Sequence, residues 1–391
     1  MSKEKRRVPK LRFPGFTEDW EQRKLGNLAT VEMNKRIFKE QTTTKGDIPF
    51  YKIGTFGSDA DSFISRELFE EYKNKYPYPN IGDILISASG SIGRTVVYNG
   101  EDAYYQDSNI VWLNHNGQID NSFLLQFYNQ VKWAGLEGST IKRLYNKNIL
   151  ETNIALPKIE EQRLIGKFFK LVDSSITLHQ RKLEHLNLKK KALLQKLFPK
   201  NGERYPELRF PGFTDAWEQR KLSDITEIVM GQSPSSKNYT DNPNDNILVQ
   251  GNADLKDGKV VPRLWTKEIT KTIDKDGIIL TVRAPVGDVA KTDYKVVLGR
   301  GVAGIKGNDY IYQFLQKLQN NRYWVSLSSG STFESINSND IKDLIIDIPS
   351  IEEQTKISML LNNVNSIITL HQRKLEHLQL QKKALLQQMF V

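Results

Sequence analysis

The longest regular pattern of apolar positions lies between residues 165 and 197, and it returns 192 residues later. Apolar residues follow one another at alternating intervals of four and three, the period of a coiled-coil seam. The first seam comprises Ile165, Phe169, Val172, Ile176, His179, Leu183, Leu186, Lys190, Leu193 and Leu197; the second comprises Ile357, Leu361, Val364, Ile368, His371, Leu375, Leu378, Lys382, Leu385 and Met389. No Pro or Gly interrupts 167–198 or 350–391. The pattern predicts two helices of about 35 residues, each about 50 Å long.

The linker after the first predicted helix restricts how the two helices can pair. Only PKNGERYPE (199–207) separates this helix from the second variable segment. The second segment must therefore begin near the far end of the first helix, and its own helix can reach the first only by running back along it. We expect an antiparallel coiled coil with one globular domain at each end.

Outside the helices, short apolar runs bounded by Gly, Asn, Asp and Ser are typical of β-strands. The clearest runs are DILISAS (83–89), RTVVYNG (94–100), NIVWLNH (109–115), GIILTVR (277–283) and YKVVLG (294–299), with short helices predicted at 65–75 and 310–319. The fold class is therefore α+β, with two globular domains and two long helices. The predicted segments are a first domain over 1–155 with an N-terminal arm at 1–25, a first helix with the start of the linker over 156–200, a second domain over 201–347 and a second helix over 348–391.

A repeated phrase opens each half of the chain. LRFPGFTEDWEQRKL (11–25) returns as LRFPGFTDAWEQRKL (208–222), and the helix headers LPKIEEQ and IPSIEEQ recur at 156–162 and 348–354. The chain is thus two half-repeats with pseudo-two-fold character, each a variable segment followed by a constant one. We expect the aromatic residues of the phrase to pack an arm onto the domain or the helix rather than to be exposed for recognition: Phe13, Phe16, Trp20, Phe210, Phe213 and Trp217.

Charge adds a candidate partner. The 391-residue chain has 56 Lys and Arg against 46 Asp and Glu, a net charge of +10. Such an excess favours a polyanion such as nucleic acid, although it is also compatible with mere solubility. Cysteine is absent, which excludes disulfides and thiolate metal sites. No run approaches the roughly 18 apolar residues of a membrane span, so we expect a soluble cytoplasmic protein with no membrane partner.

The sequence contains no recognisable catalytic constellation. It has neither a G-x-x-x-x-G-K-[ST] phosphate loop nor an H-E-x-x-H zinc pair, and four of the five histidines belong to the repeated helix. A G-x-G-x-x-G pattern occurs at Gly299, Gly301 and Gly304, but no helix signal follows it, so a tight turn in a sheet is the better interpretation. No Asn-Pro-Pro-aromatic motif for amino methylation is present, which disfavours a self-sufficient DNA methyltransferase.

The doubled LRFPGFT…W…KL phrase and the two IEEQ-headed helices that alternate with variable segments resemble the specificity subunit of Type I restriction-modification enzymes. The likeness covers essentially the whole chain. It implies that the variable segments are target recognition domains, each reading one half of a bipartite, asymmetric DNA target. A rod of about 50 Å would then set half-site centres about one helical turn, about 34–36 Å, apart.

The same resemblance implies partners and cofactors. The subunit would have no catalytic activity of its own and would assemble with two modification (methyltransferase) subunits, and with restriction subunits that carry endonuclease and ATP-driven translocase activity. No cofactor would be bound by this chain; S-adenosylmethionine, ATP and Mg²⁺ would belong to the partners. The alternative is a coiled-coil scaffold whose two heads bind other proteins.

Candidate DNA contacts are polar loop residues, because base edges are read by Arg, Lys, Asn, Gln and small hydroxyl side chains. In the second domain we select Gln232, Ser233, Ser235, Gln250, Asn252 and Arg283; in the first domain Asn34, Lys35, Arg36, Lys52, Thr55, Ser87, Ser89 and Ser91, with Lys142 and Arg143 as phosphate contacts. Glu334 and Ser335 stand where Lys142 and Arg143 would recur, so a phosphate role there is not shared between the halves.

The helices also carry leucines off the seam, which a two-helix rod would leave exposed: Leu171, Leu178, Leu188, Leu194, Leu370, Leu380 and Leu386. We expect these residues to dock the modification subunits. Residues 156–200 hold 11 basic against 4 acidic residues, which is compatible either with a solvated face or with phosphate contact along the rod.

Overall fold

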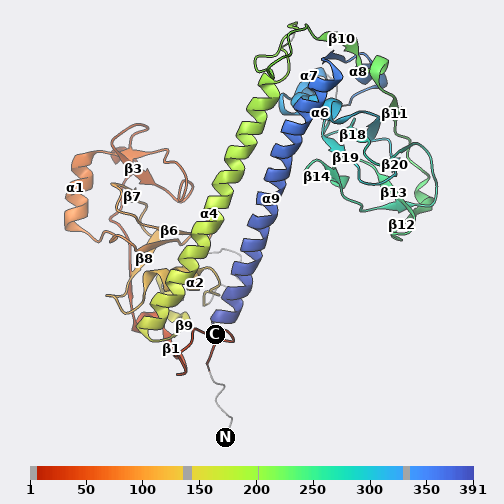
Figure 1. Cartoon of the computed structure of the whole chain (residues 1–391). Coiled ribbons are helices and arrows are strands. Elements are labelled where there is room, and N and C mark those ends of the chain that lie inside the picture. The colour runs from red at the N-terminus through yellow and green to blue at the C-terminus, as the bar shows by residue number, and fades with distance from the viewer. Residues whose placement is uncertain (1–6, 135–142, 201, 329–334) are drawn as a thin grey trace. The chain divides into compact units, whose positions relative to one another are not determined.

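The computed structural model describes residues 7–134, 143–200, 202–328 and 335–391. The chain forms two compact units: unit 1 contains residues 1–179 and 374–391, and unit 2 contains residues 180–373. The two predicted long helices are present as α4 (Ile159–Lys196) and α9 (Ile351–Met389), with 38 and 39 residues. Each unit combines a sheet-rich part with portions of both helices (Figure 1).

Burial along the two helices follows the predicted seam. All ten positions of the first seam, nine in α4 and Leu197 directly after it, and all ten in α9 are buried or partly buried. In unit 1, Ile165 and Phe169 from the first half of α4 share a core with Met389 at the end of α9. In unit 2, Leu197 at the end of α4 shares a core with Ile357 and Leu361 near the start of α9. The apolar period therefore predicted correctly which face of each helix is buried.

Two of the seven leucines predicted to be exposed are buried instead. Leu194 is 1% exposed and belongs to the core of unit 2, and Leu386 is 9% exposed and belongs to the core of unit 1. Both residues lie near the C-terminal end of their helix, where the globular part of the unit covers more than the seam face. The other five leucines are exposed, as expected.

Unit 1 contains a four-stranded sheet with the order β2-β8-β5-β6, a three-stranded sheet with the order β4-β3-β7, and the pair β1-β9. The strands are β1 (Glu21–Lys24), β2 (Thr30–Glu32), β3 (Ile48–Tyr51), β4 (Phe63–Ile64), β5 (Ile84–Ser87), β6 (Thr95–Val97), β7 (Tyr104–Tyr105), β8 (Ile110–Asn114) and β9 (Asn153–Leu156). The short helices are α1 (Arg66–Lys75), α2 (Asn121–Tyr128) and α3 (Asn146–Glu151), with 3-10 turns at Leu25–Asn27 and Lys39–Gln41.

Unit 2 contains a six-stranded sheet with the order β11-β21-β18-β19-β15-β14, a five-stranded sheet with the order β12-β16-β13-β20-β17, and the pair β10-β22. The strands are β10 (Glu218–Lys221), β11 (Ile228–Met230), β12 (Tyr239–Thr240), β13 (Asn246–Val249), β14 (Leu255–Lys256), β15 (Lys259–Val260), β16 (Trp265–Thr266), β17 (Thr272–Ile273), β18 (Ile278–Thr281), β19 (Val289–Lys291), β20 (Val296–Leu298), β21 (Val302–Ile305) and β22 (Ile345–Ile348). The helices are α5 (Leu222–Ile225), α6 (Asp309–Asn320), α7 (Tyr323–Ser328) and α8 (Ser338–Lys342), with 3-10 turns at Ser236–Asn238 and Asn252–Asp254.

The variable segments share a topology although their sequences scarcely match. In unit 1, β5 lies between β6 and β8, and in unit 2, β18 lies between β19 and β21 in the same antiparallel sense. The parallel pair β3-β7 corresponds to the parallel pair β13-β20. The internal repeat therefore extends through the globular parts, where the sequences of the two halves scarcely match each other.

A buried ion pair explains why the LRF phrase and the IEEQ header recur together. The Arg12 guanidinium donates to both carboxylate oxygens of Glu161, at 2.7 and 2.8 Å, and Arg209 does the same to Glu353, at 2.8 and 2.9 Å. Both glutamates are almost fully buried, with 0% and 1% of the side chain exposed. The hydrogen bonds that Arg12 donates to Glu161 raise the pKa of Arg12. Each N-terminal arm is thus fixed to the start of its long helix.

The aromatic residues of the phrase pack as predicted. Trp20 and Trp217 are 2% and 1% exposed. The Trp20 ring lies 6.0 Å from Phe390 at the end of the chain, and the Trp217 ring lies 6.3 Å from Phe198. The predicted packing role of the arm is therefore confirmed.

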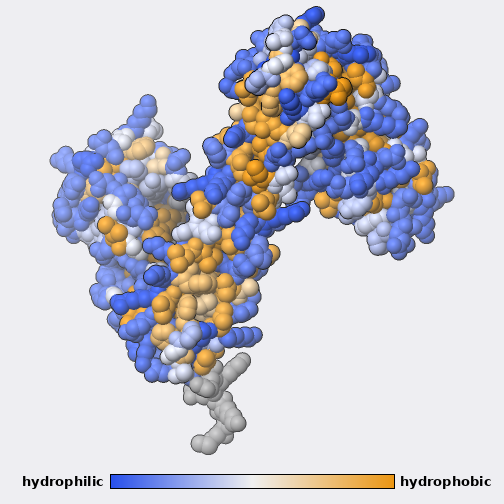
Figure 2. All heavy atoms as spheres, viewed as in Figure 1, coloured by the Kyte–Doolittle hydropathy of each residue, from blue (hydrophilic) through white to orange (hydrophobic). Residues whose placement is uncertain are grey.

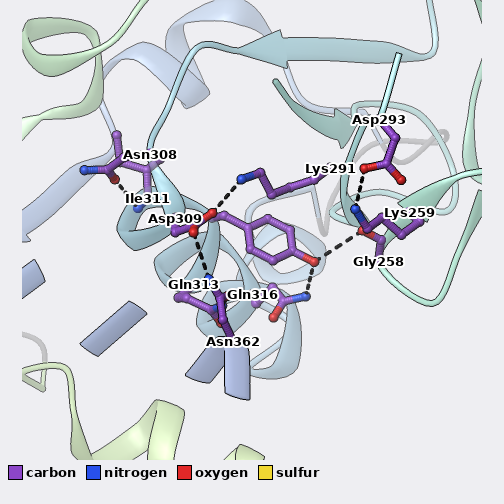
Figure 3. A network of polar contacts seen from close by, with 11 residues as sticks. Gly258, Lys259, Lys291, Asp293, Asn308, Asp309, Ile311, Gln313, Gln316 and Asn362 are labelled. Carbon is purple, nitrogen blue, oxygen red and sulfur yellow. Dashed lines mark hydrogen bonds and ion pairs between the residues drawn. The ribbon is translucent and has the colours of Figure 1, made fainter. Parts of the chain in front are cut away.

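In unit 2 a polar network ties the sheet to α9. Lys291 at the end of β19 lies 2.5 Å from a carboxylate oxygen of Asp309, and Asn362 of α9 donates to the other oxygen of Asp309 at 2.7 Å (Figure 3). Gln313 donates in turn to the Asn362 side-chain oxygen at 2.8 Å. The first turn of α6 therefore joins the sheet to the long helix.

No described helix combines the length and the apolar character needed to cross a bilayer.

Candidate nucleic-acid interface

In unit 2 the ends of four strands meet at the turn Gly299–Gly301. The Gly299 amide donates to the Val249 carbonyl at the end of β13 at 2.7 Å, and the Val282 amide after β18 donates to the Gly301 carbonyl at 2.9 Å. The amide of Gln232, after β11, donates to the Leu298 carbonyl at 2.8 Å. A side chain at Gly301 would place its Cβ 2.1 Å from the Gln250 carbonyl, so only glycine fits. The G-x-G-x-x-G pattern is therefore a tight turn, as predicted.

Most candidates from the second domain lie on the loops around this turn. Gln232, Asn252 and Arg283 are exposed, and Ser233 and Gln250 are partly buried. Several are held in place: the Ser233 hydroxyl accepts from the Arg300 amide at 3.0 Å, and the Gln250 amide group donates to the Tyr239 hydroxyl at 2.7 Å. We define this set, Gln232, Ser233, Gln250, Asn252, Arg283 and Arg300, as the unit 2 loop surface.

Two further contacts shape the edge of this surface. The Asn252 side chain donates to Asp288. The Ser235 amide donates to Glu268 at 2.8 Å, and hydrogen bonds from Asn238 and from that amide lower the pKa of Glu268. The Ser235 side chain is exposed. Its loop is held in place by the hydrogen bond from the Ser235 amide to the ionised carboxylate of Glu268.

The equivalent place in unit 1 is the segment Asp107–Asn109, which precedes β8. The Ala88 amide after β5 donates to the Asn109 carbonyl at 2.7 Å, and the Ser108 amide lies 3.3 Å from the Met33 sulfur atom after β2. The Ile53 amide after β3 donates to the side chain of Gln106 at 3.0 Å. Loops that follow β2, β3 and β5 therefore converge here as the corresponding loops do in unit 2.

Candidates from the first domain gather around this segment, but their charges are largely paired. Arg36 lies 3.1 Å from Asp107, and Arg143 donates to the Ser108 carbonyl at 3.3 Å. The Ser89 hydroxyl donates to Asn109 at 2.8 Å. We define Lys35, Arg36, Ser89, Ser108 and Arg143 as the unit 1 loop surface. Ser91 is also exposed, and Lys142 lies outside the described residues.

Three candidates lie at the border of this surface or stabilise its turns. The Lys35 ammonium lies 5.2 Å from the centre of the Tyr76 ring, and Lys52 lies 2.9 Å from Asp61. The Thr55 hydroxyl accepts from the Lys52 amide at 3.1 Å and so closes a turn. Their contacts are local, and Lys35 is the most exposed of the three.

Asn34 and Ser87 were wrong as DNA contacts, since they are only 2% and 1% exposed. The Asn34 side chain donates to the Pro77 carbonyl at 3.2 Å. The Ser87 hydroxyl donates to the Ser91 carbonyl and accepts from the Arg94 amide, and Thr281 makes the same pair of bonds with Pro285 and Asp288 in unit 2. A short hydroxyl side chain here closes the loop from within, because buried backbone groups need partners.

Sequence reasoning missed the residue at the centre of each loop surface. Ser108 and Arg300 lie 192 residues apart, the same offset as the repeated helices, and each occupies the turn between two strands. That offset, applied to the turn that follows YKVVLG, was the signal that could have found them. Arg300 is exposed, and Ser108 has a positive φ of 53°.

The loop surfaces offer guanidinium, amide and hydroxyl groups at the ends of rigid strands, which suits hydrogen bonding to a polar ligand rather than bond cleavage. Within the part of the chain that the structure describes, no group of three or more His, Asp or Glu residues could hold a metal ion. The most exposed charges on these surfaces are cationic, in keeping with the net charge of +10.

Comparison with known proteins gives a consistent result. A sequence model of the family "Type I restriction modification DNA specificity domain" matches residues 17–188 and again 214–380. A putative type I restriction enzyme specificity subunit from Haemophilus influenzae is 54% identical over 157 residues, which are 39% of this chain and 41% of that relative. The putative MjaX specificity subunit from Methanocaldococcus jannaschii is 28% identical over 395 residues, covering 94% of this chain and 92% of the relative.

Solved structures agree with this fold. The S subunit of a type I restriction-modification system from M. genitalium superposes with a TM-score of 0.66 at 15% identity, over 98% of this chain and 99% of that chain. A chain from a structural study of complex assembly and conformational transition in a type I R-M system gives a TM-score of 0.57 at 20% identity, over 97% and 98% of the two chains. The match to the family model favours the specificity-subunit hypothesis over a general protein-binding scaffold. Because the family model matches both halves of the chain, the protein belongs to the family of Type I restriction-modification specificity subunits and carries two DNA specificity domains.

Proposed function

We propose that each unit binds double-stranded DNA through its loop surface, and that the two surfaces read the two halves of a bipartite, asymmetric target. The observation that carries the proposal is that the same strand ends converge in both units while the side chains there differ. A shared frame with different polar groups is what two different half-sites would require. The chain itself would perform no catalysis.

The chemistry of the loops supports direct readout in the major groove. Arg side chains suit the N7 and O6 acceptors of guanine, and Asn and Gln side chains suit the acceptor and donor of adenine. Small hydroxyl groups can form hydrogen bonds with either base. Gln232, Asn252 and Arg283 present such groups in unit 2, and Lys35 and Ser89 present them in unit 1. Arg143, close to the central segment of unit 1, remains a candidate phosphate contact.

We also propose that α4 and α9 pair as an antiparallel coiled coil that sets the distance between the half-sites. Two contacts within separate units support it: Phe169 near the start of α4 meets Phe390 after α9 in unit 1, and Leu197 at the end of α4 shares a core with Ile357 near the start of α9 in unit 2. Both contacts join the beginning of one helix to the end of the other.

The exposed apolar side chains of the helices are the proposed docking sites for methyltransferase subunits. On α4, Leu164, Leu171 and Leu178 are 43%, 65% and 52% exposed and follow one another at intervals of seven, which puts them on one helix face. Figure 2 shows apolar side chains gathered along α4. In unit 2, Met359 and Leu370 of α9 are 61% and 66% exposed. Burying such side chains against a partner is favourable, by about 1.5–3 kcal/mol each.

By this proposal the chain works in the cytoplasm, within a complex. Two methyltransferase subunits would bind S-adenosylmethionine, and restriction subunits would bind ATP and Mg²⁺, so that methylation and cleavage would take place on the partners. This chain would contribute the choice of DNA sequence.

The test is selection of random DNA duplexes by this chain assembled with its methyltransferase partner. The expected result is enrichment of two defined half-sites separated by a spacer of fixed length and undefined sequence. Enrichment of no sequence, with equal retention of all duplexes, would contradict the proposal. Saturable binding of S-adenosylmethionine to the chain alone would contradict the assignment of catalysis to the partners.

A further inference from the structure

We infer that the half-site read by unit 2 contains guanine, and that Arg300 and Arg283 recognise it in the major groove. The inference rests on the proposed function, since it names the base that one of the two loop surfaces reads. It follows from a difference between the units in how their arginines are paired.

Arg300 lies at the centre of the unit 2 loop surface on a rigid backbone. Its amide donates to the Ser233 hydroxyl at 3.0 Å, and both neighbouring residues are fixed: Gly299 donates to Val249, and Gly301 accepts from Val282. The Arg300 side chain is exposed, and among the described residues its guanidinium has no hydrogen-bond or ion-pair partner. A fixed backbone with a guanidinium that no described group occupies is suited to base reading, because little backbone freedom is lost when the side chain binds.

Arg283 is held next to this turn in the same way. It follows Val282, whose amide donates to Gly301 and whose carbonyl accepts from the Ile336 amide at 2.9 Å. Its own backbone forms an antiparallel bridge with Ser335. The residue is exposed, and no described side chain pairs with its guanidinium. Two guanidinium groups that no described side chain pairs with are thus presented on adjoining loops.

Asp288, an acidic side chain beside these loops, already accepts hydrogen bonds from two amide side chains. Asp288 accepts from Asn252 through one carboxylate oxygen and from Gln319 through the other, at 2.7 Å for the latter. Among the described residues, no ion pair joins Arg283 or Arg300 to a carboxylate.

Unit 1 is built differently at the same place. Ser108 stands where unit 2 has Arg300, and Arg143 of unit 1 donates to the Ser108 carbonyl and hydroxyl, at 3.3 and 3.2 Å. Arg36 is paired with Asp107 at 3.1 Å. Because the arginines of unit 1 are occupied by protein groups, unpaired guanidinium groups at the centre of the surface distinguish unit 2.

Guanine is the base that fits such groups. It presents two acceptors, N7 and O6, on its major-groove edge, and the two parallel N–H groups of arginine bind both at once. Adenine offers one acceptor and one donor there, and a guanidinium has no acceptor for the donor. Each well-formed pair discriminates against other bases by about 5- to 150-fold in affinity.

The experiment compares the wild-type chain with R300A and R283A, each assembled with the methyltransferase partner, on the selected target. A second target carries 7-deazaguanine, which lacks the N7 acceptor, at the guanines of one half-site. For the wild type we expect the 7-deazaguanine target to bind about 5- to 150-fold more weakly. Each single variant should lose part of the difference between the two targets, the variant that lacks both arginines should bind both targets equally weakly, and the guanine preference should change in that half-site alone.

Matched controls separate base reading from general loss of charge. R220A removes an exposed arginine on β10, outside the unit 2 loop surface. This variant should bind both targets with the same affinity as the wild type. Equal weakening on every DNA by R300A and R283A, or a half-site sensitive to unit 2 substitutions that contains no guanine, would overturn the inference while leaving sequence reading intact. Failure of the wild-type complex to select any sequence would instead contradict the proposed function.

Discussion

Two buried glutamates, Glu161 and Glu353, make equivalent ion pairs in the first turns of the two long helices. Each carboxylate accepts two hydrogen bonds from one arginine of the N-terminal arm. Replacing Glu161 by Gln leaves Arg12 nearly buried without a counter-charge, and breaking a buried pair in this way costs about 3–5 kcal/mol. We therefore expect E161Q to lower the free energy of unfolding of unit 1 by about that amount, measured by chemical denaturation.

The control for this prediction is an ion pair of similar length at the surface. Lys221 lies 2.7 Å from Asp343, but the two side chains are 52% and 60% exposed. K221A should leave the free energy of unfolding nearly unchanged, because exposed ion pairs contribute little to stability. An E161Q chain that unfolds at the same denaturant concentration as K221A would show that the buried pair is not needed.

Individual contacts were the hardest feature to predict from the sequence. The chemistry of a loop residue can be read from its letter, but its exposure depends on partners far along the chain. Asn34 is buried because its side chain meets Pro77, 43 residues away. Glu161 stands in the IEEQ header of the first predicted helix, and its partner Arg12 is 149 residues distant. Only the recurrence of both motifs in each half hinted at the pairing.

At the level of the helices, the two seam lysines have different surroundings. Lys382 lies 2.6 Å from Asp173, whereas the 192-residue repeat assigns Asn365 to the position equivalent to Asp173 in unit 2. Burial lowers the pKa of Lys190 to about 8, from its ordinary value of 10.5. Between these values the unfolded state binds more protons than the folded state, so the stability of unit 2 should rise with pH over this window.

The measurement is the free energy of unfolding of the wild type and of K190M at pH values from 7 to 11. We expect the difference between the two chains to change by on the order of 2 kcal/mol between pH 8 and 10.5, the wild type gaining as Lys190 loses its proton. N365D, which supplies a carboxylate, should reduce this rise. Parallel profiles for the wild type and K190M would show that Lys190 is not buried in the charged form at neutral pH.

Element types were largely predictable, because periodicity follows directly from burial on one face. The strands β5, β8 and β18 lie within predicted runs, and the seam positions of α4 and α9 are buried. The pattern failed at Leu194 and Leu386, which lie off the seam but inside the cores of the units. A heptad pattern describes only helix pairing, and it cannot show where a globular part covers another face.

For the whole molecule, the apolar face of α4 makes the docking proposal testable. L171D and L178D place a charge on exposed residues of this face, so they should preserve the thermal unfolding of the free chain. They should weaken binding of the methyltransferase subunit, measured by titration, by about tenfold or more. T177D adds the same charge at an exposed residue off this face and should bind normally. Normal binding by all three variants would contradict docking on α4.

The spacing proposal concerns both helices at once. An antiparallel pair keeps its register only if equal lengths are removed at the same level, and the Asp173–Lys382 contact fixes that level. In the proposed antiparallel pair, residues 183–189 of α4 would lie opposite residues 366–372 of α9, and deleting both heptads preserves the alternation of four and three. Seven residues correspond to about 10.5 Å of helix, or about three base pairs at about 3.4 Å each.

We expect the doubly deleted chain, assembled with its partner, to select the same two half-sites with a spacer about three base pairs shorter. Deletion of one heptad alone should disrupt the pairing instead. An unchanged spacer after the double deletion would mean that the helices do not determine the distance between the sites.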